Sequence, residues 1–337
     1  MKKIALLSLL VILNISCSLQ KNYTETVSPL KYLNTITAED LKTHLYIVAA
    51  DSMEGRETGS VGQKKAGVYL INQYKKNNIP FPKGATTYYQ PIPASYLNKK
   101  YGEKLGDSEN IWAFIEGSEK PNEILVISAH YDHVGTKDNE VYNGADDDGS
   151  GTVALLEIAQ AFEIAKKEGH GPKRSILFLH VTGEEHGLHG SRFYSENPLF
   201  PIANTITDIN IDMIGRRDEA HAASNNYVYV IGANRLSTDL DNICTIANAK
   251  YTHLDLDYKY NDPKDPNRFY ERSDHYNFAK NGIPSVFLFN GVHADYHKAT
   301  DSADKIEYDA LAKRAQFAFA TAWELANRLD RPVVDKK

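Results

Sequence analysis

Five short motifs of acidic residues and histidine are spread along the chain in a fixed order. They are His130-Tyr131-Asp132, Asp146-Asp147-Asp148, Glu184-Glu185, Asp212 and Tyr296-His297. Imidazole and carboxylate groups are the ligands that zinc takes in catalytic sites. The set offers the two imidazoles and at least three carboxylates that a pair of zinc ions needs. One glutamate is left over as a possible general base, so the motifs point to metal-assisted hydrolysis.

The first motif follows an apolar run over residues 124–129, so His130 is placed to bind metal at the end of a buried strand. Residues two apart in a strand point the same way, and Asp132 can therefore reach back to the imidazole. A carboxylate on the far nitrogen fixes the tautomer of a ligating histidine and raises its basicity. His133 is either a further metal ligand or local support.

Three adjacent aspartates, residues 146–148, precede Gly149-Ser150-Gly151, where we expect a long helix to begin. Their carboxylates could simply interact with the positive end of the helix dipole. Alternatively, one carboxylate could be shared by two cations and hold them roughly 3.5–4 Å apart. The presence of His130 earlier in the chain favours the shared ligand.

The remaining motifs supply two acids in tandem, a lone acid and a second imidazole. Glu184 and Glu185 follow the most apolar of the expected strands, residues 176–181, and such neighbours repel each other unless one binds metal. The other can then accept a proton from water. Asp212 also follows an apolar run, where a carboxylate needs a partner. His297 alone would be a surface histidine, but in this set it is a candidate ligand, and Tyr296 can offer its phenol to an oxyanion.

Strands and helices alternate along most of the chain. We expect strands over 110–115, 124–129, 176–181, 206–211, 227–231 and 285–289, and strand character over 86–92. We expect helices that begin at Thr37, Ser60 and Gly149, and helices over 236–248, 274–280 (capped by Ser273) and 307–329. This alternation predicts a single α/β domain, with a mostly parallel mixed sheet and helices on both faces. Ligands bind beyond the carboxyl ends of such strands, where the motifs can converge. Residues 252–272 should form a surface loop that borders the cleft.

The first residues resemble an export signal. Lys2 and Lys3 precede an apolar run over 4–15 that is too short to span a bilayer. Ser16-Cys17 resembles a bacterial lipoprotein cleavage site, and the alternative is a plain signal peptide. We therefore expect a signal peptide over 1–16, a polar tether over 17–36 and one domain over 37–337. The protein would be exported and anchored to the membrane at Cys17, or otherwise secreted.

Composition narrows the class of protein. The 337 residues are 42% hydrophobic and 24% charged, an ordinary globular balance, and the net charge is −6. With no basic patch or stripe, we expect no nucleic-acid partner. Cys244, the second of the two cysteines, lies in an apolar helical stretch and should be a small core residue.

The ordered motifs resemble those of the co-catalytic zinc aminopeptidases of metallopeptidase family twenty-eight. The match runs from about Asp40 to Asp304 and includes the segments 53–60 and 272–275. The resemblance implies a zinc exopeptidase fold, also called phosphorylase/hydrolase-like, and two zinc ions per chain. It also implies a cis bond between Asp147 and Asp148. Its ligand set is His130 and Asp212 on one ion, Glu185 and His297 on the other, and Asp147 as the bridge; Glu184 is the base, Asp132 supports His130 and Tyr296 stabilises the oxyanion.

The function expected from this resemblance is that of an aminopeptidase, whose partners are peptides with a free N-terminus. One alternative is a glutaminyl cyclase-like enzyme, which uses a single zinc. Another is a non-catalytic, lipid-anchored peptide-binding protein on the same scaffold. Carboxypeptidase action on acidic dipeptides is a further alternative, for which Arg216, Arg217, Arg268 and Arg272 are available. The tyrosines of residues 252–272 hint at a preference for apolar or aromatic side chains. The sequence leaves the oligomeric state open.

Overall fold

A twisted sheet of eight strands forms the centre of the molecule. The computed structural model describes residues 28–99 and 104–336, so the expected signal peptide and Cys17 lie outside the described residues. The strands follow the order β1-β2-β6-β3-β7-β10-β8-β9 across the sheet. Their bounds are β1 Tyr89–Ile92, β2 Ser108–Ile115, β3 Lys120–His130, β6 Arg174–Val181, β7 Thr205–Ile211, β8 Tyr227–Ile231, β9 Asp255–Asp257 and β10 Ser285–Phe289. A separate two-stranded hairpin joins β4 Thr136–Lys137 to β5 Glu140–Val141.

The middle of the sheet is parallel. Strand β3 pairs in parallel with β6 and β7, and β7 pairs in parallel with β10. Antiparallel pairing occurs between β1 and β2, β2 and β6, and β8 and β10. The mixed, mostly parallel sheet predicted from the sequence is therefore confirmed. Because the central strands are covered on both faces, β3 and β6 are apolar over most of their buried lengths, whereas β7 also buries Thr207, Asp208 and Asn210.

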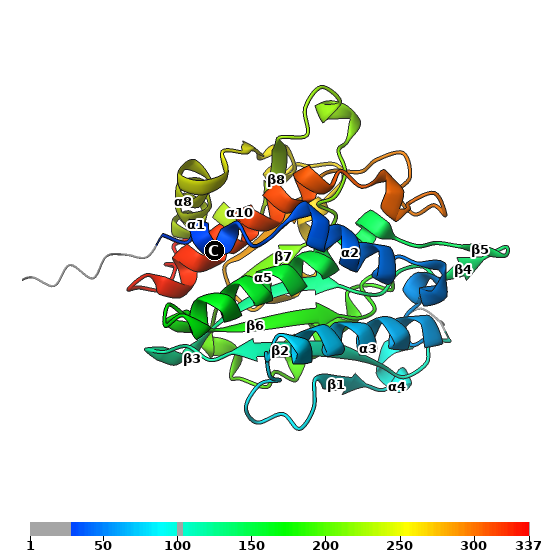
Figure 1. The fold of residues 1–337 in the computed structure, drawn as a ribbon, viewed down its shortest axis with the longest axis horizontal. Coiled ribbons are helices and arrows are strands. Elements are labelled where there is room, and N and C mark those ends of the chain that lie inside the picture. Colours follow the sequence, from blue (N-terminus) through cyan, green and yellow to red (C-terminus); the bar gives the residue numbers. More distant parts are fainter. Residues whose placement is uncertain (1–27, 100–103, 337) are drawn as a thin grey trace, which may run out of the picture.

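Helices cover both faces of this sheet (Figure 1). One face packs against α1, α2, α3, α5, α8 and α10, several of which lie in front of the sheet in Figure 1, and the other packs against α6 and α9. The helices are α1 Leu30–Leu33, α2 Ala38–Val48, α3 Val61–Lys76, α4 Ala94–Leu97, α5 Gly151–Lys167, α6 His189–Glu196, α7 Ala233–Leu236, α8 Thr238–Ala247, α9 His275–Ala279 and α10 Tyr308–Asn327. Within the described residues, none of the helices has the length and apolar character to cross a membrane.

The expected helix starts are confirmed where the sequence supplies a cap. The Thr37 side chain accepts a hydrogen bond from the Asp40 backbone at the start of α2, and Ser60 caps α3 in the same way. The expected cap at Ser273 is wrong: Asp274 occupies the N-cap position of α9 without a side-chain cap, and the Ser273 hydroxyl contacts the candidate site instead.

Two segments differ from the sequence-based expectation. Residues 30–36, expected to belong to the tether, include helix α1 and bury Tyr32, Leu33 and Ile36 in the main core. Their apolar side chains explain why this part of the chain packs instead of remaining a polar linker. Residues 252–272, expected to be one long loop, contain strand β9 at the sheet edge and the short 3-10 turns Lys259–Asn261 and Phe269–Glu271.

Candidate metal centre

The carboxyl ends of the four parallel central strands meet at one edge of the sheet and carry the motifs. Strand β3 ends at His130, β6 is followed by Glu184 and Glu185, and β7 is followed directly by Asp212. His297 lies in the loop after β10. This convergence is the one expected for ligands of a parallel sheet.

Asp147 lies between the other motifs. It belongs to the turn Ala145–Ser150, which leads into α5, and its bond to Asp148 is cis. Its Oδ1 lies 3.2 Å from Nε2 of His130, and its Oδ2 lies 3.0 Å from Nε2 of His297. The two oxygens of one buried carboxylate therefore face different imidazoles, as a bridging ligand must.

Each side of Asp147 is completed by one further carboxylate. On the first side, Oδ1 of Asp212 lies 3.6 Å from Nε2 of His130. On the second side, Oε2 of Glu185 lies 3.0 Å from Nε2 of His297. The five ligands predicted from the sequence are thus brought together as two groups that share Asp147.

Two neighbouring residues could also contribute ligand atoms. His133 Nδ1 lies 2.7 Å from Oε1 of Glu185 and 3.9 Å from Oδ2 of Asp147, which puts it within reach of the second group. Asp148 lies beside His130 and Asp212 in the first group. However, Oδ1 of Asp148 already accepts hydrogen bonds from the backbone of Gly151 and Met213, at 2.8 and 3.1 Å, so it is engaged in fixing the turn.

Four polar atoms of this centre are buried without hydrogen-bond partners within the described residues. Within the described part of the chain, His130 Nε2, Asp147 Oδ2, His133 Nδ1 and Glu185 Oε1 form no hydrogen bond. His133 and Glu185 lie close together yet are not aligned to bond each other. Buried polar atoms without partners are costly, and those that converge on a common point suit a cation. The residues present therefore fit two zinc ions, which take imidazole and carboxylate ligands.

The electrostatics of the centre favour bound cations. Burial alone would raise the pKa of the Asp147 carboxyl, but the imidazoles of His130 and His297 hold it well below its usual value. Burial lowers the pKa of His297, but Asp147 and Glu185 outweigh it and raise that pKa to about 10. An imidazole nitrogen facing two carboxylates strongly holds a proton, or a metal ion in its place.

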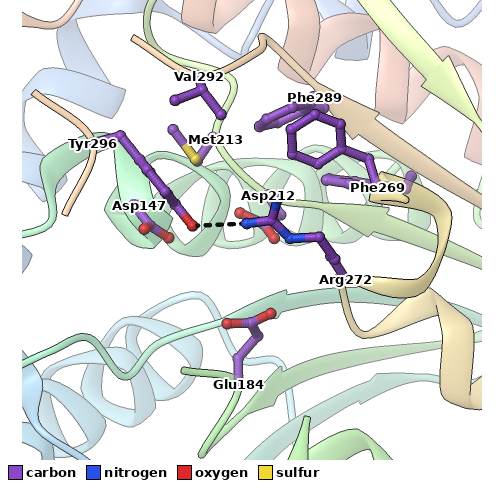
Figure 2. A pocket seen from close by; sticks show the side chains of 10 residues that line it. Asp147, Glu184, Asp212, Met213, Phe269, Arg272, Phe289, Val292 and Tyr296 are labelled. Carbon is purple, nitrogen blue, oxygen red and sulfur yellow. Dashed lines mark hydrogen bonds between the residues drawn. The ribbon is translucent and has the colours of Figure 1, made fainter. Parts of the chain in front are cut away.

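Glu184 differs from Glu185 in its surroundings. It lies in the same pocket as Asp147 and Asp212, and it points across this pocket toward them (Figure 2). Burial raises the pKa of the Glu184 carboxyl well above its usual value, and the Asp212 and Glu185 carboxylates raise it further. A carboxylate with a raised pKa is suited to accept a proton near neutral pH.

Asp132 lies behind His130, as predicted, but its backbone makes the closer contact. The Asp132 carbonyl oxygen is 3.1 Å from Nδ1 of His130, whereas Oδ1 is 3.8 Å away. The carboxylate accepts hydrogen bonds from the Thr58 hydroxyl at 2.8 Å and from the Glu184 backbone at 3.3 Å. Asp132 therefore links the loops after β3 and β6 and places Glu184 relative to His130.

Two contacts around Asp212 and Asp147 could not be assigned from the sequence. The Ser273 hydroxyl donates to Oδ2 of Asp212 at 2.6 Å and accepts from the Asn210 amide at 2.7 Å. The Asp301 carboxylate accepts the backbone N–H groups of Asp146 and Asp147, at 3.0 and 3.2 Å. Both side chains hold ligand-bearing segments, but neither residue type signals such a role on its own.

Arg56 is a fully buried residue whose side chain binds the backbone of segments next to the centre. Its guanidinium donates to the backbone carbonyls of Tyr131, Val48, Asn143 and Gly144, at 2.7–2.9 Å. These carbonyls belong to α2, to the loop after β3 and to the segment before Asp146. The motif of residues 53–60 is therefore structural, because it ties the first two ligand loops together.

Tyr296 and a group of apolar side chains, here called the apolar wall, border the same pocket (Figure 2). The Tyr296 hydroxyl is 3.5 Å from Nη2 of Arg272, and burial and the nearby carboxylates raise the pKa of Tyr296 above its usual value. The wall consists of Met213, Phe269, Phe287, Phe289 and Val292. Phe269 and Arg272 come from the segment 252–272, which does border the pocket, whereas Tyr258, Tyr260 and Tyr270 are not among the residues that line it.

Comparison with known protein families identifies the family to which the chain belongs. The model of peptidase family M28 matches residues 110–322, which include all five predicted ligands. The chain belongs to peptidase family M28. The predicted class, a metallopeptidase, is confirmed by this match and by zinc metalloproteases and aminopeptidases among the relatives.

The relatives differ in length and in degree of similarity. A probable zinc metalloprotease of Pyricularia oryzae is 26% identical over 65% of this chain and 50% of its own length. A probable leucine aminopeptidase 2 of Aspergillus oryzae is 30% identical over 63% of this chain and 44% of its own length. A vacuolar membrane protease of Aspergillus fumigatus is 29% identical over 45% of this chain and 15% of its own length. The chain thus spans half or less of these relatives.

Solved structures share the fold. An aminopeptidase from Aneurinibacillus superposes with a TM-score of 0.67 at 16% identity and covers 92% of this chain and 98% of its own. The LapA aminopeptidase of Legionella pneumophila superposes with a TM-score of 0.68 at 20% identity, covering 90% of this chain and 75% of its own. The zinc exopeptidase fold expected from the sequence is confirmed.

Proposed function

We propose that this protein is an aminopeptidase that removes N-terminal residues from peptides. The observation that carries the proposal is the shared position of Asp147 between the pairs His130–Asp212 and His297–Glu185. Two ions held by these five residues would supply Lewis acidity toward water and toward the scissile carbonyl. The names of the aminopeptidase relatives support the choice of substrate.

In the proposed mechanism, Glu184 accepts the proton of the attacking water and later returns it to the leaving amine. Its raised pKa and its place across the pocket from Asp147 suit both steps. Tyr296 donates its hydroxyl proton as a hydrogen bond to the developing oxyanion. Asp132 keeps Glu184 in place through its backbone N–H. The apolar wall receives the side chain of the N-terminal residue.

The alternative functions are less well supported. A cyclase of the glutaminyl type would need one zinc, whereas the residues form two candidate groups of metal ligands. A non-catalytic binding protein would not need Glu184 opposite the ligands. Zinc analysis of the purified protein should therefore give two ions per chain, and one tightly bound ion with cyclase activity would contradict the proposal.

Replacement of the base gives the direct test. We expect Glu184→Gln to lower kcat on aminoacyl fluorogenic substrates by at least about 10²-fold, because general base catalysis is lost. Zinc content should stay at the wild-type value, since Glu184 is not in the ligand set. A chelator should abolish wild-type activity across the substrate panel, and added zinc should restore it. Near-normal activity of the variant would refute the assignment of the base.

We also propose that the protein is exported and anchored through a lipid on Cys17. The support is the sequence Ser16-Cys17 after an apolar run. Labelling cells with a radioactive fatty acid should mark the wild-type protein and not a Cys17→Ala variant. Release of an unlabelled wild-type protein into the medium would instead indicate a plain signal peptide.

A further inference from the structure

Arg272 is a cation at the mouth of a pocket that otherwise carries carboxylates. The pocket is lined by Asp147, Glu184 and Asp212 together with the apolar wall and Tyr296. The guanidinium lies 4.8 Å from the ring centre of Phe269 and 3.5 Å from the Tyr296 hydroxyl (Figure 2). The side chain is exposed, and with the residues that the structure describes it forms no ion pair.

The other three arginines that the sequence offered for substrate recognition are occupied. Arg216 pairs with Asp295 at 2.9 Å, Arg217 pairs with Glu307 at 2.9 Å, and Arg268 pairs with Glu271 at 2.5 Å. Arg272 alone among the four lines the pocket and keeps its charge available for a ligand. A guanidinium binds a carboxylate through two parallel hydrogen bonds, which makes a carboxylate its natural ligand.

The apolar wall indicates which part of a peptide carries that carboxylate. Met213, Phe287, Phe289 and Val292 disfavour a charged side chain on the N-terminal residue, because it would lose its hydration against them. The carboxylate would then belong to the residue after the scissile bond. In a dipeptide its carbon lies three bonds from the scissile carbonyl carbon, roughly 4 Å away. Because the Arg272 guanidinium lies 3.5 Å from the Tyr296 hydroxyl, which is offered to the carbonyl oxygen, it can reach a carboxylate close to the scissile bond.

We propose that Arg272 is a specificity-determining residue that binds a carboxylate on the second residue of the substrate. The inference rests on the proposed aminopeptidase function and narrows its substrate class. The preferred substrates are dipeptides and short peptides with an apolar N-terminal residue. Their carboxylate is the free α-carboxylate of a dipeptide or an acidic side chain at the second position.

Paired substrates test this inference and separate the two sources of the carboxylate. One pair is leucyl-leucine and its amide, which differ in the α-carboxylate. The other is a pair of leucyl dipeptide amides with glutamate or glutamine second, which differ in the side chain. Wild-type kcat/KM should favour the carboxylate member of at least one pair by about tenfold or more, mainly through KM. The pair that shows the preference identifies the source.

Variants of two arginines on the same segment complete the experiment. Arg272→Gln should bring the preferred ratio close to one, and Arg272→Lys should retain part of it. The matched control Arg268→Gln, three residues before and outside this pocket, should keep the wild-type ratio. A wild-type ratio near one in both pairs, or a ratio unchanged in Arg272→Gln, would overturn the inference. Failure to cleave any of the four peptides would instead count against the proposed function.

Discussion

At the scale of single residues, the candidate centre depends on side chains that hold the ligands as much as on the ligands themselves. Ser273 donates to Asp212, Asp132 accepts from the Glu184 backbone, and Asp301 accepts from the backbone of Asp147. Each of these contacts fixes a rotamer or a turn that free carboxylates would not keep, because their mutual repulsion drives them apart. Partners of this kind commonly tune metal affinity.

The contact between Ser273 and Asp212 leads to a prediction on metal affinity. In Ser273→Ala, Asp212 loses its only side-chain hydrogen bond within the described residues, so one of the two proposed zinc ions should bind about 10–100-fold more weakly. Competition with a chromophoric chelator would measure both affinities. Ser195→Ala is a suitable control, since within the described residues the Ser195 hydroxyl donates to the backbone carbonyls of Ser191 and Asn277 and to no candidate ligand. Equal loss at both zinc sites, or none, would contradict the prediction.

The candidate ligands could be proposed from the sequence, whereas the side chains that support them could not. His130, Glu185 and Asp212 each lie at or just after the end of a strand that is expected from the sequence, which is a signal that can be read locally. Ser273 gave a misleading signal, because a serine before a short helix resembles an N-cap. Its actual partner, Asp212, lies 61 positions away, directly after strand β7. Such pairings depend on the order of strands in the sheet, which local patterns do not contain.

At the scale of elements, strands were predicted more reliably than the segments between them. The bounds expected for β8 and β10 are the observed ones, because both are short apolar runs between polar turns. Helix α6 was not predicted, since its eight residues include few apolar ones and its left-handed N-cap, Leu188, gives no signal. The sequence does not predict α1 either, because a single turn of helix is too short to show periodicity.

The Arg56 side chain connects α2, the loop after β3 and the segment before Asp146. We expect its replacement to lower the free energy of unfolding. Arg56→Met would leave four buried carbonyls without their donor, each worth about 1–3 kcal/mol. We expect the free energy of unfolding to fall by more than about 3 kcal/mol in urea titrations. Arg331→Met is the control, because Arg331 is partly exposed and should change stability by less than about 0.5 kcal/mol. A similar small change in Arg56→Met would show that the loops hold without it.

At the scale of the whole molecule, the fold must keep ionisable groups uncharged in its core. His180 lies fully buried in β6 with its Nε2 2.7 Å from the Tyr74 hydroxyl. Burial lowers the pKa of His180 to about 3. In the unfolded chain a histidine has a pKa of about 6.5, so between these values only the unfolded state binds the proton. The contribution of His180 to stability is therefore complete above pH 6.5 and is lost progressively as the pH falls toward 3.

This linkage predicts a change in the pH dependence of stability. Between pH 6 and pH 4, His180 should lower the free energy of unfolding by about 1.4 kcal/mol per pH unit. In His180→Gln that part of the slope should disappear, whatever the stability of the variant at pH 7. Urea titrations at several pH values would measure it, with exposed His170→Gln as a control that keeps the wild-type slope. A wild-type slope in His180→Gln would disprove the linkage.

The spacing of the ligands along the chain has a consequence for the timing of activity. The centre draws on strands β3, β6, β7 and β10, and its last ligand, His297, comes 167 residues after His130. A chain that is still being synthesised and has not yet reached His297 therefore lacks part of the candidate ligand set. On the proposed function, a nascent chain cannot cleave peptides in the compartment that makes it. Hydrolysis can begin only after His297 has been synthesised and has folded into place beside the other candidate ligands, so a partly made chain would be inactive.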